Sequence, residues 1–276
     1  MKFGICNEMF VNRPVTEVIP SIAKLGYHGI ELAPFTLAED LESFSTEAQR
    51  QIARCAADHG VEILGLHWLL AKPAGLHLTS PDRSVRSRTR DVFRKVIEIG
   101  SNTGGKILTL GSPSQRSFAR GETQDIAVQR VLDFFQGLSP DLESTGVTVG
   151  LEPLETTLTN FMTRTAEACC IADAIGSPRV GITLDTHFVR WECAEFGATL
   201  KGTFDLVGKR LVHLHIQDDN LLAPGTGKAD FSEYVAIVKG IGWRGYISVE
   251  AFGVAEEGRG EQIAAGAMAF FREHFA

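Results

Sequence analysis

The stretch Val180-Gly-Ile-Thr-Leu-Asp185 is a short apolar run that ends in a carboxylate. Three more runs have this form, each ending in a polar side chain: Val147-Thr-Val-Gly-Leu-Glu152, Leu211-Val-His-Leu-His215 and Tyr246-Ile-Ser-Val-Glu250. Helix-like segments separate the four runs. A (β/α)8 barrel gathers side chains from the ends of separate strands at one rim, where barrel enzymes keep their chemistry. The pattern therefore predicts that three carboxylates and one imidazole converge at the rim of a barrel.

The rest of the chain repeats the same unit. Strand-like apolar runs lie at residues 2–6, 28–33, 62–68, 106–110, 147–152, 180–185, 211–217 and 245–250. Apolar positions at helical spacing lie between them, and Gly26, Gly60 and Gly242 are placed to end helices in the left-handed conformation. We interpret residues 1–276 as one α/β domain, a (β/α)8 TIM barrel.

Two features complete the predicted barrel. A terminal helix with Ile263, Ala267 and Phe271 on one face would close the outer ring against the first and last strands. The longest connections are residues 69–84 and 111–123. Connections of this length in a compact domain are more often lids or binding loops than idle links.

Charge and composition exclude several classes of protein. A chain of 276 residues with 44% apolar content can bury a large core, and its net charge of −7 argues against broad binding to nucleic acid. One basic cluster consists of Arg83, Arg86, Arg88, Arg90, Arg94 and Lys95. Apolar residues interleave it at helical spacing, which favours the solvated face and start of a helix.

Cysteine usage and hydropathy indicate the compartment. The five cysteines are an odd number without a CxxC pair, which fits reduced thiols in a cytosol. No stretch approaches the roughly 20 consecutive apolar residues that a membrane-spanning helix needs. We expect a soluble, cytoplasmic protein without a signal peptide and without a nucleic-acid or membrane partner.

The four rim residues predict a metal site. Burying Glu152, Asp185 or Glu250 as an unpartnered carboxylate is prohibitively costly, and a divalent cation is the simplest common partner. For any one of them alone, a helix cap or a salt bridge is an equally good interpretation. His213 and His215 point to the same side of their strand. His215, nearer the rim, is the better ligand, and His213 is expected to be buried beside it.

This set of ligands indicates a type of ion and of chemistry. Three oxygen donors and one imidazole suit Mn²⁺, Mg²⁺ or Co²⁺, although Zn²⁺ stays open. An ion that chelates a carbonyl and the adjacent hydroxyl would acidify the C–H between them and stabilise an enediolate. Two of the glutamates, on opposite sides of a sugar, could then exchange the proton as acid and base.

Several motifs carry a family resemblance. They are Gly150-Leu-Glu-Pro-Leu154, Leu184-Asp-Thr186, His213-Leu-His-Ile216, Ala223-Pro-Gly-Thr-Gly227 and Ile241-Gly-Trp-Arg-Gly-Tyr-Ile-Ser-Val-Glu250. In this order they resemble the xylose-isomerase-like barrel superfamily of sugar phosphate isomerases and epimerases, especially its ketose 3-epimerase branch of tagatose or psicose type. The resemblance implies that Glu152, Asp185, His215 and Glu250 are metal ligands, with Glu152 and Glu250 also the acid/base pair.

The chain departs from that branch at two positions. The ketose epimerases have a histidine three residues after the aspartate, whereas here His187 follows Asp185 by two residues and Phe188 stands in the expected place. They also have an arginine six residues after the ligand histidine, where this chain has Leu221. Two substrate contacts are thus in question, and the sugar could differ from a simple ketohexose. His187 is interpreted as a substrate contact, with packing as the alternative.

Other candidates lie near further strand ends. Glu8, Glu31 and His67 would point into the same pocket. His67 and Trp68 are interpreted as sugar contacts, with packing as the equal alternative. The run Gly111-Ser-Pro-Ser-Gln-Arg116 could bind a hydroxyl or phosphate through Ser112, Gln115 and Arg116, or be only a proline-containing turn. Lys228 is a weaker phosphate candidate.

The leading hypothesis is a metal-dependent sugar isomerase or epimerase that moves a proton beside a ketose carbonyl, with Mn²⁺ as the expected ion. The alternative is a metal-dependent dehydratase of inosose or dehydroshikimate type, which would release water. An endonuclease-IV-like DNA repair enzyme is less favoured, because it needs more ligands and a basic face. A small sugar or sugar phosphate is the expected partner, and homodimers or homotetramers are common among the proteins that the chain resembles.

Overall fold

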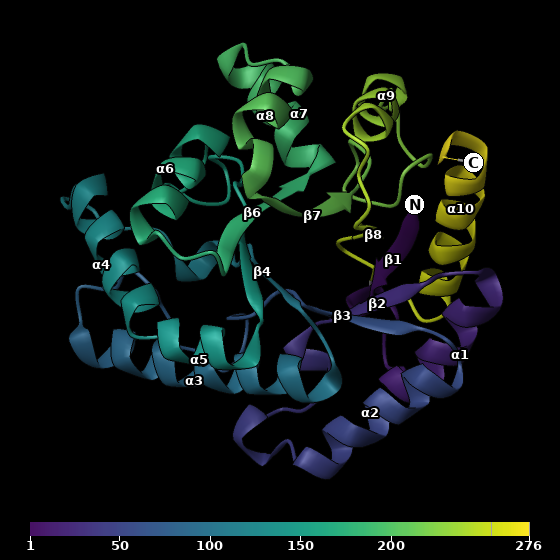
Figure 1. Cartoon of the computed structure of the whole chain (residues 1–276), viewed down its shortest axis with the longest axis horizontal. Helices are drawn as coiled ribbons and strands as arrows, with labels where there is room; N and C mark the ends of the chain where they lie inside the picture. The colour runs from purple at the N-terminus through teal and green to yellow at the C-terminus, as the bar shows by residue number, and fades with distance from the viewer. Residues whose placement is uncertain (255, 276) are drawn as a thin grey trace.

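The computed structural model describes residues 1–254 and 256–275, and its centre is a closed barrel of parallel strands (Figure 1). The strands are β1 (Lys2–Cys6), β2 (Gly29–Leu32), β3 (Glu62–Leu66), β4 (Ile107–Leu110), β5 (Thr148–Leu151), β6 (Val180–Asp185), β7 (Leu211–Ile216) and β8 (Tyr246–Val249). They follow one another around the barrel in chain order, and β8 pairs with β1 to close it. The predicted (β/α)8 TIM barrel is confirmed.

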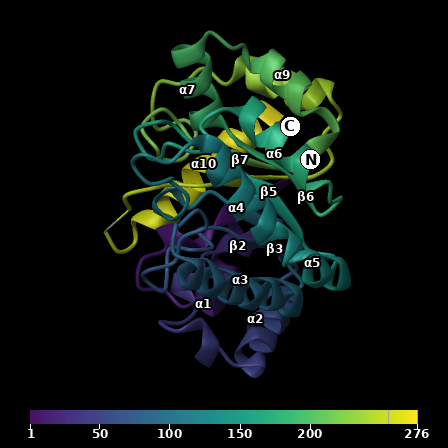
Figure 2. The ribbon, with the colours of Figure 1, turned by 90° about the vertical axis from the view of Figure 1, so that its left-hand side faces the viewer.

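Helices surround the barrel, as the side view in Figure 2 shows. They are α1 (Val15–Leu25), α2 (Thr46–Asp58), α3 (Arg83–Thr103), α4 (Gln124–Gln136), α5 (Ser139–Thr145), α6 (Thr165–Ile175), α7 (Thr186–Phe196), α8 (Leu200–Val207), α9 (Ser232–Gly240) and α10 (Arg259–Phe275). Across the described ranges, no helix has both the length and the apolar content to cross a membrane.

Local sequence determines where several helices begin and end. Ser45 caps α2 by accepting a hydrogen bond from the Ala48 N–H, and Asp82 caps α3 in the same way. The predicted glycine ends are confirmed at Gly26 and Gly60, where φ is +98° and +67°. The basic cluster also lies on α3 as predicted, where Arg83, Arg88 and Arg94 are exposed and Arg86, Arg90 and Lys95 are half-buried.

The two ends of the chain pack against each other. Phe3 on β1 stacks on Phe271 of α10 with ring centroids 4.2 Å apart, and Tyr27 donates a hydrogen bond to the Ala264 carbonyl. Both views place the N- and C-termini close together, with α10 beside β1 and α1. The predicted apolar face of the terminal helix is buried, so the helix closes the outer ring.

Several predicted strands extend a residue or two beyond the observed ones at the rim. β3 ends at Leu66 and β7 at Ile216, so His67, Trp68 and Gln217 lie just beyond the ladder. At these positions the backbone leaves the neighbouring strands, but the side chains of His67, Trp68 and Gln217 are still apolar or buried. Hydropathy alone does not separate the last paired residue from the first residue of the loop.

Gly65 allows close pairing between the neighbouring strands β3 and β4. It lies opposite Ile107, and a Cβ atom at Gly65 would overlap the Ile107 carbonyl. Gly65→Ala should lower the free energy of unfolding by about 1–3 kcal/mol, because backbone must move to admit the methyl group. Denaturant unfolding measures this. Gly266→Ala on α10 is the control, because its added methyl meets open space, and equal stabilities for the two variants would contradict the prediction.

Candidate metal centre

The four predicted ligands come together at the rim. Glu152 directly follows β5, Asp185 is the last residue of β6, His215 lies in β7 and Glu250 directly follows β8. Asp185 and His215 are also register partners in the sheet. All four side chains are buried. Consecutive parallel strands end at the same side of the barrel, which accounts for this convergence.

His215 is the centre of the group. Its Nδ1 atom lies 3.3 Å from Glu152 Oε1 and 3.0 Å from Glu250 Oε2. One ligand atom from each of these three residues lies within 4.8 Å of the others. Glu152 Oε1 and His215 Nδ1 are buried without a hydrogen-bond partner among the described residues. Such atoms are costly to bury unless something else coordinates them.

Asp185 adjoins the group but has a second task. Its Oδ1 accepts hydrogen bonds from the backbone N–H groups of His187 and Phe188 and so caps α7. Its Oδ2 is buried and has no hydrogen-bond partner within residues 1–254 and 256–275. Asp185 is not one of the three residues within mutual 4.8 Å reach. The cap fixes the carboxylate, and the free oxygen remains available to an ion.

A carboxylate inside the barrel holds the histidines. Glu31 Oε1 lies 2.6 Å from His213 Nε2, and Glu31 Oε2 lies 3.3 Å from His215 Nε2. A carboxylate on the far nitrogen of a ligand histidine fixes the tautomer and the direction of the ring. The expectation that His213 is buried beside the ligand is met by this geometry.

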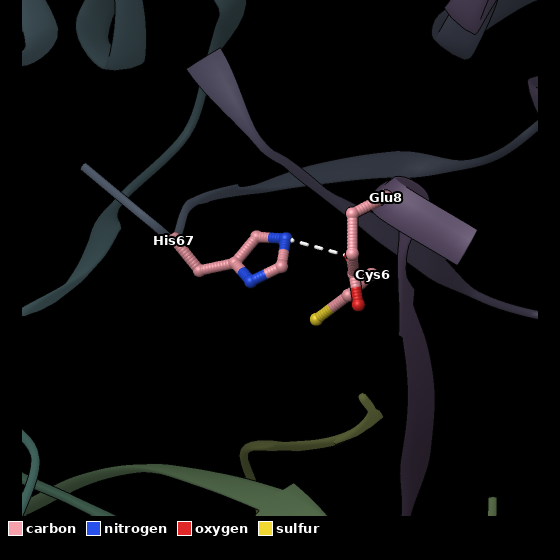
Figure 3. A group of neighbouring side chains, drawn as sticks. All are labelled: Cys6, Glu8 and His67. Carbon is pink, nitrogen blue, oxygen red and sulfur yellow. Dashed lines mark ion pairs between the residues drawn. The ribbon is translucent and has the colours of Figure 1, made fainter. Parts of the chain in front are cut away.

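His67 links two glutamates, and Figure 3 shows its ion pair with one of them, Glu8. Its Nε2 lies 3.0 Å from Glu8 Oε2, and its Nδ1 lies 3.2 Å from Glu250 Oε1. Cys6 lies beside them, and burial raises the pKa of its thiol to about 12. Both imidazole nitrogens have carboxylate neighbours and the sulfur is protonated, so this trio suits holding Glu250 in place better than holding an ion.

Gln217 is a site residue that the sequence reasoning missed. Its buried Nε2 donates a hydrogen bond of 3.0 Å to Glu250 Oε2. A signal was present, because His213, His215 and Gln217 follow one another at the two-residue spacing of a strand and point to one side. The carboxylate of Glu250 is therefore oriented by both His67 and Gln217.

Burial and like charge govern the titration of the acids. Burial and the nearby charge of Glu250 raise the pKa of Glu152. Burial, with the charges of Glu250 and Glu152, raises the pKa of Asp185 well above its ordinary value. Burial also acts on Glu250, but His215 and the hydrogen bonds of His215 and His67 outweigh it and lower that pKa to about 2. The site concentrates more negative charge than its own residues balance.

These residues fit a divalent cation. Buried oxygens of Glu152 and Asp185 that accept no hydrogen bond from the described residues, the Nδ1 atom of His215 and the Glu250 carboxylate supply hard oxygen donors and one nitrogen. Such a set suits Mn²⁺, Mg²⁺ or Co²⁺. An ion here would also offset the repulsion that raises the pKa values of Glu152 and Asp185.

A cavity of about 580 Å³ opens onto the centre. Glu152 and Glu250 lie in its wall, together with Glu8, His67 and Trp68. The two predicted sugar contacts on the third strand's loop, His67 and Trp68, thus border the space where a ligand would lie. Residues at the start of both long connections, Ala71 and Gly111 among them, also line it.

Arg116 lies elsewhere than expected. It is fully buried, and its guanidinium donates to the backbone carbonyls of Leu110, Glu152 and Met162. It does not belong to the cavity wall. Burial lowers the pKa of Arg116 to about 10. The expected contact of its side chain with a substrate is therefore replaced by a bridge between the loops that follow β4 and β5.

The remaining candidates do not line the cavity either. His187 Nε2 lies 3.6 Å from Glu155 Oε2, so His187 reaches the cavity only through Glu155. Ser112 accepts a hydrogen bond from the Leu70 N–H, and Gln115 accepts one through its carbonyl from the Leu78 N–H. Lys228 is exposed on the loop after β7.

Fold and site together define a (β/α)8 barrel with a candidate divalent-metal centre at its rim. A family model described as xylose isomerase-like TIM barrel matches residues 19–274. The chain belongs to this family, as the sequence motifs predicted.

Relatives with curated functions are ketose epimerases. An L-ribulose 3-epimerase of Methylomonas sp. (strain DH-1) is 26% identical over 68% of this chain and 65% of its own length, just under two thirds. A D-psicose 3-epimerase of Agrobacterium fabrum is 24% identical over 85% of this chain and 78% of its own. These relatives are isomerase-class enzymes, in agreement with the class predicted from the sequence.

Solved structures share the fold. A D-psicose 3-epimerase with D-tagatose from Clostridium cellulolyticum H10 superimposes with a TM-score of 0.84 at 20% sequence identity, over 99% of both chains. At this identity the likeness establishes the barrel architecture, and the chemistry rests on the residues of the site.

Ion binding should release protons. Because Glu152 and Asp185 have raised pKa values, they hold protons at a pH where free carboxyls are ionised. Burial opposes a charge on His215, but Glu31 and Glu250 outweigh it and raise its pKa as well. Mn²⁺ must displace these protons, so its affinity should rise with pH, by about tenfold per pH unit for each proton displaced.

Calorimetric titrations with Mn²⁺ in buffers of different ionisation enthalpy count the released protons directly. An affinity that does not change with pH, with no proton release, would show that these groups do not bind the ion.

Gly111 keeps space for the Glu152 carboxylate. A Cβ atom at Gly111 would overlap Glu152 Oε2, the end of a flexible side chain. Gly111→Ala should therefore displace that carboxylate and weaken Mn²⁺ binding by about tenfold or more, while the melting temperature changes little. Calorimetry and thermal unfolding measure the two effects, with Gly266→Ala as the matched control. A large loss of stability with unchanged affinity would refute this role.

Proposed function

We propose that the protein is a divalent-metal-dependent sugar epimerase or isomerase that moves a proton beside the carbonyl of a keto-sugar. The observation that carries the proposal is the buried cluster of Glu152, His215 and Glu250 beside Asp185, from which Glu152 and Glu250 line the cavity. The ketose 3-epimerases among the relatives support the same class of reaction. Mn²⁺ is the expected ion, with Mg²⁺, Co²⁺ and Zn²⁺ as alternatives.

The contacts of each residue determine the role that we assign to it. Glu152, Asp185, His215 and Glu250 would hold the ion. When bound, a divalent ion would polarise the substrate carbonyl and stabilise the charge that develops on its oxygen. Glu250 is held as a carboxylate by Gln217 and His67, so we assign it to remove the proton. Glu152, whose Oε1 receives no hydrogen bond from the described residues, returns a proton on the other side, and the roles exchange in the reverse reaction.

The charge of the cavity favours an uncharged sugar. Glu8, Glu152, Glu155 and Glu250 line it, whereas Lys72 is the one lysine or arginine among the described residues of the wall. A phosphate group would meet mainly carboxylates there. The same imbalance weighs against a phosphodiester substrate, such as that of a DNA repair enzyme.

Carboxylate-to-amide variants test the acid/base pair. Glu152→Gln and Glu250→Gln should each slow the reaction by about 10²–10⁴-fold, because each loses a group that moves a proton, and should keep part of the Mn²⁺ affinity. His215→Ala should lose Mn²⁺ binding itself, because it removes the shared ligand. The reaction is followed by NMR in D2O as deuterium enters carbon beside the carbonyl of ketoses, ketose phosphates and inososes, with a chelated sample as reference.

Exposed Glu143→Gln provides the control for the same chemical change on the surface. Wild-type exchange in either site variant would overturn the assigned roles. The products separate the reaction types, since an epimerase gives a stereoisomer and a dehydratase gives a product that has lost water.

A further inference from the structure

Beyond the charged base, most of the cavity wall is apolar, although Lys72 and Glu155 also line it. It includes Phe35, Trp68, Leu158, Phe188, Leu221 and Phe252. These residues come from loops that follow five different strands and from the start of α7. Two of them, Phe188 and Leu221, occupy the positions where the resembled ketose epimerases have polar side chains. The wall is thus apolar where a polyhydroxylated ligand would need hydrogen-bond partners.

The aromatic side of the wall is packed as a unit. The ring of Trp68 lies edge-on to Phe252, with centroids 5.4 Å apart, and to Phe35, with centroids 6.5 Å apart. Trp68 Nε1 is buried and has no hydrogen-bond partner in the part of the chain that the structure describes. The wall therefore offers a broad apolar surface around the Trp68 ring, which suits a ligand that is mostly apolar at this end.

Backbone conformation holds two of these residues in place. Trp68 has φ of +53° and Leu221 has φ of +62°, in the left-handed region that bulky residues rarely adopt. The Leu221 carbonyl also accepts a hydrogen bond of 2.8 Å from the Phe252 N–H. The loops after β7 and β8 are thereby tied together so that Leu221 and Phe252 share one surface.

We propose that the substrate is a keto-sugar that carries an apolar substituent, such as an aryl or alkyl glycoside. This inference rests on the proposed function. The hydroxylated carbonyl end would lie at Glu152 and Glu250, and the substituent would lie against Leu158, Phe188 and Leu221. A cavity of about 580 Å³ is of the size that holds drug-sized ligands, roughly 300–1,000 Å³. Free hydroxyls against the apolar wall would lose their water without gaining partners.

Binding of unreactive glycosides tests the substituent alone. Methyl, hexyl and phenyl β-D-glucopyranosides have the same sugar ring, and D-psicose and phenol complete the set. Calorimetry with the Mg²⁺-loaded protein should give at least about tenfold tighter binding of the phenyl than of the methyl glycoside, because the ring is removed from water. Phenol alone should bind more weakly than the phenyl glycoside.

A polar or charged side chain placed in the wall should remove that preference. Leu221→Arg and, separately, Phe188→His should reduce the phenyl-to-methyl ratio to about one. Leu206→Arg makes the first change on exposed surface of α8 and should keep the ratio. Thermal unfolding checks that each variant is folded. Because two wall variants are used, the test still stands if one of them fails to fold.

The outcomes separate this inference from the proposed function. Equal binding of methyl and phenyl glycosides, or tighter binding of D-psicose than of the phenyl glycoside, would overturn the apolar substituent. Phenol binding as tightly as its glycoside would overturn the joint seating of sugar and substituent. The glycosides contain no ketone, so tighter binding of the phenyl glycoside does not depend on proton transfer. If that preference is found but no sugar exchanges a proton, the result counts against the proposed function alone.

Discussion

Mutual repulsion among buried carboxylates is the constraint on which the rest of the structure depends. Glu152, Asp185 and Glu250 surround one imidazole at the rim, away from water. Burial and like charge raise the pKa of Glu152 and Asp185, whereas His215 and His67 keep Glu250 ionised. The closed barrel prevents their escape, because each lies in or directly after a strand whose register its neighbours fix. A bound cation would relieve this repulsion, which is why we propose a metal site here.

The surrounding polar residues serve orientation as well as stability. Glu31 lies in the middle of the barrel, where an unpaired carboxylate would be destabilising, and its two oxygens face His213 and His215. The same contacts turn the Nδ1 atom of His215 toward the glutamates. Gln217 and His67 act similarly on Glu250. Glu31, Gln217 and His67 are buried polar groups that need hydrogen-bond partners. Their partners are His215 and Glu250, so the same contacts also orient these two proposed ligands.

Sequence reasoning succeeded where strand periodicity decides the outcome. Strand order, glycine ends and the rim positions of Glu152, Asp185, His215 and Glu250 follow from residues close together in the chain. Loops are different, because the direction of their side chains is decided by contacts with distant segments. Arg116 was expected to reach a ligand, yet it turns to the carbonyls of Glu152 and Met162. The next loop lies beside it only in the folded barrel, which the local sequence does not encode.

Strands and loops therefore control different properties of the cavity. Proton transfer requires charges held to fractions of an ångström, and strand ends in a closed barrel supply that rigidity. Selection among sugars requires shape and polarity farther out, where loops can change without disturbing the ladder. Phe188 and Leu221 illustrate this separation, since they replace polar residues of the resembled epimerases while the four proposed ligand positions are kept. Buried Arg116 joins the two regions, because it donates to the Glu152 carbonyl at the base and to the Met162 carbonyl in the loop after β5.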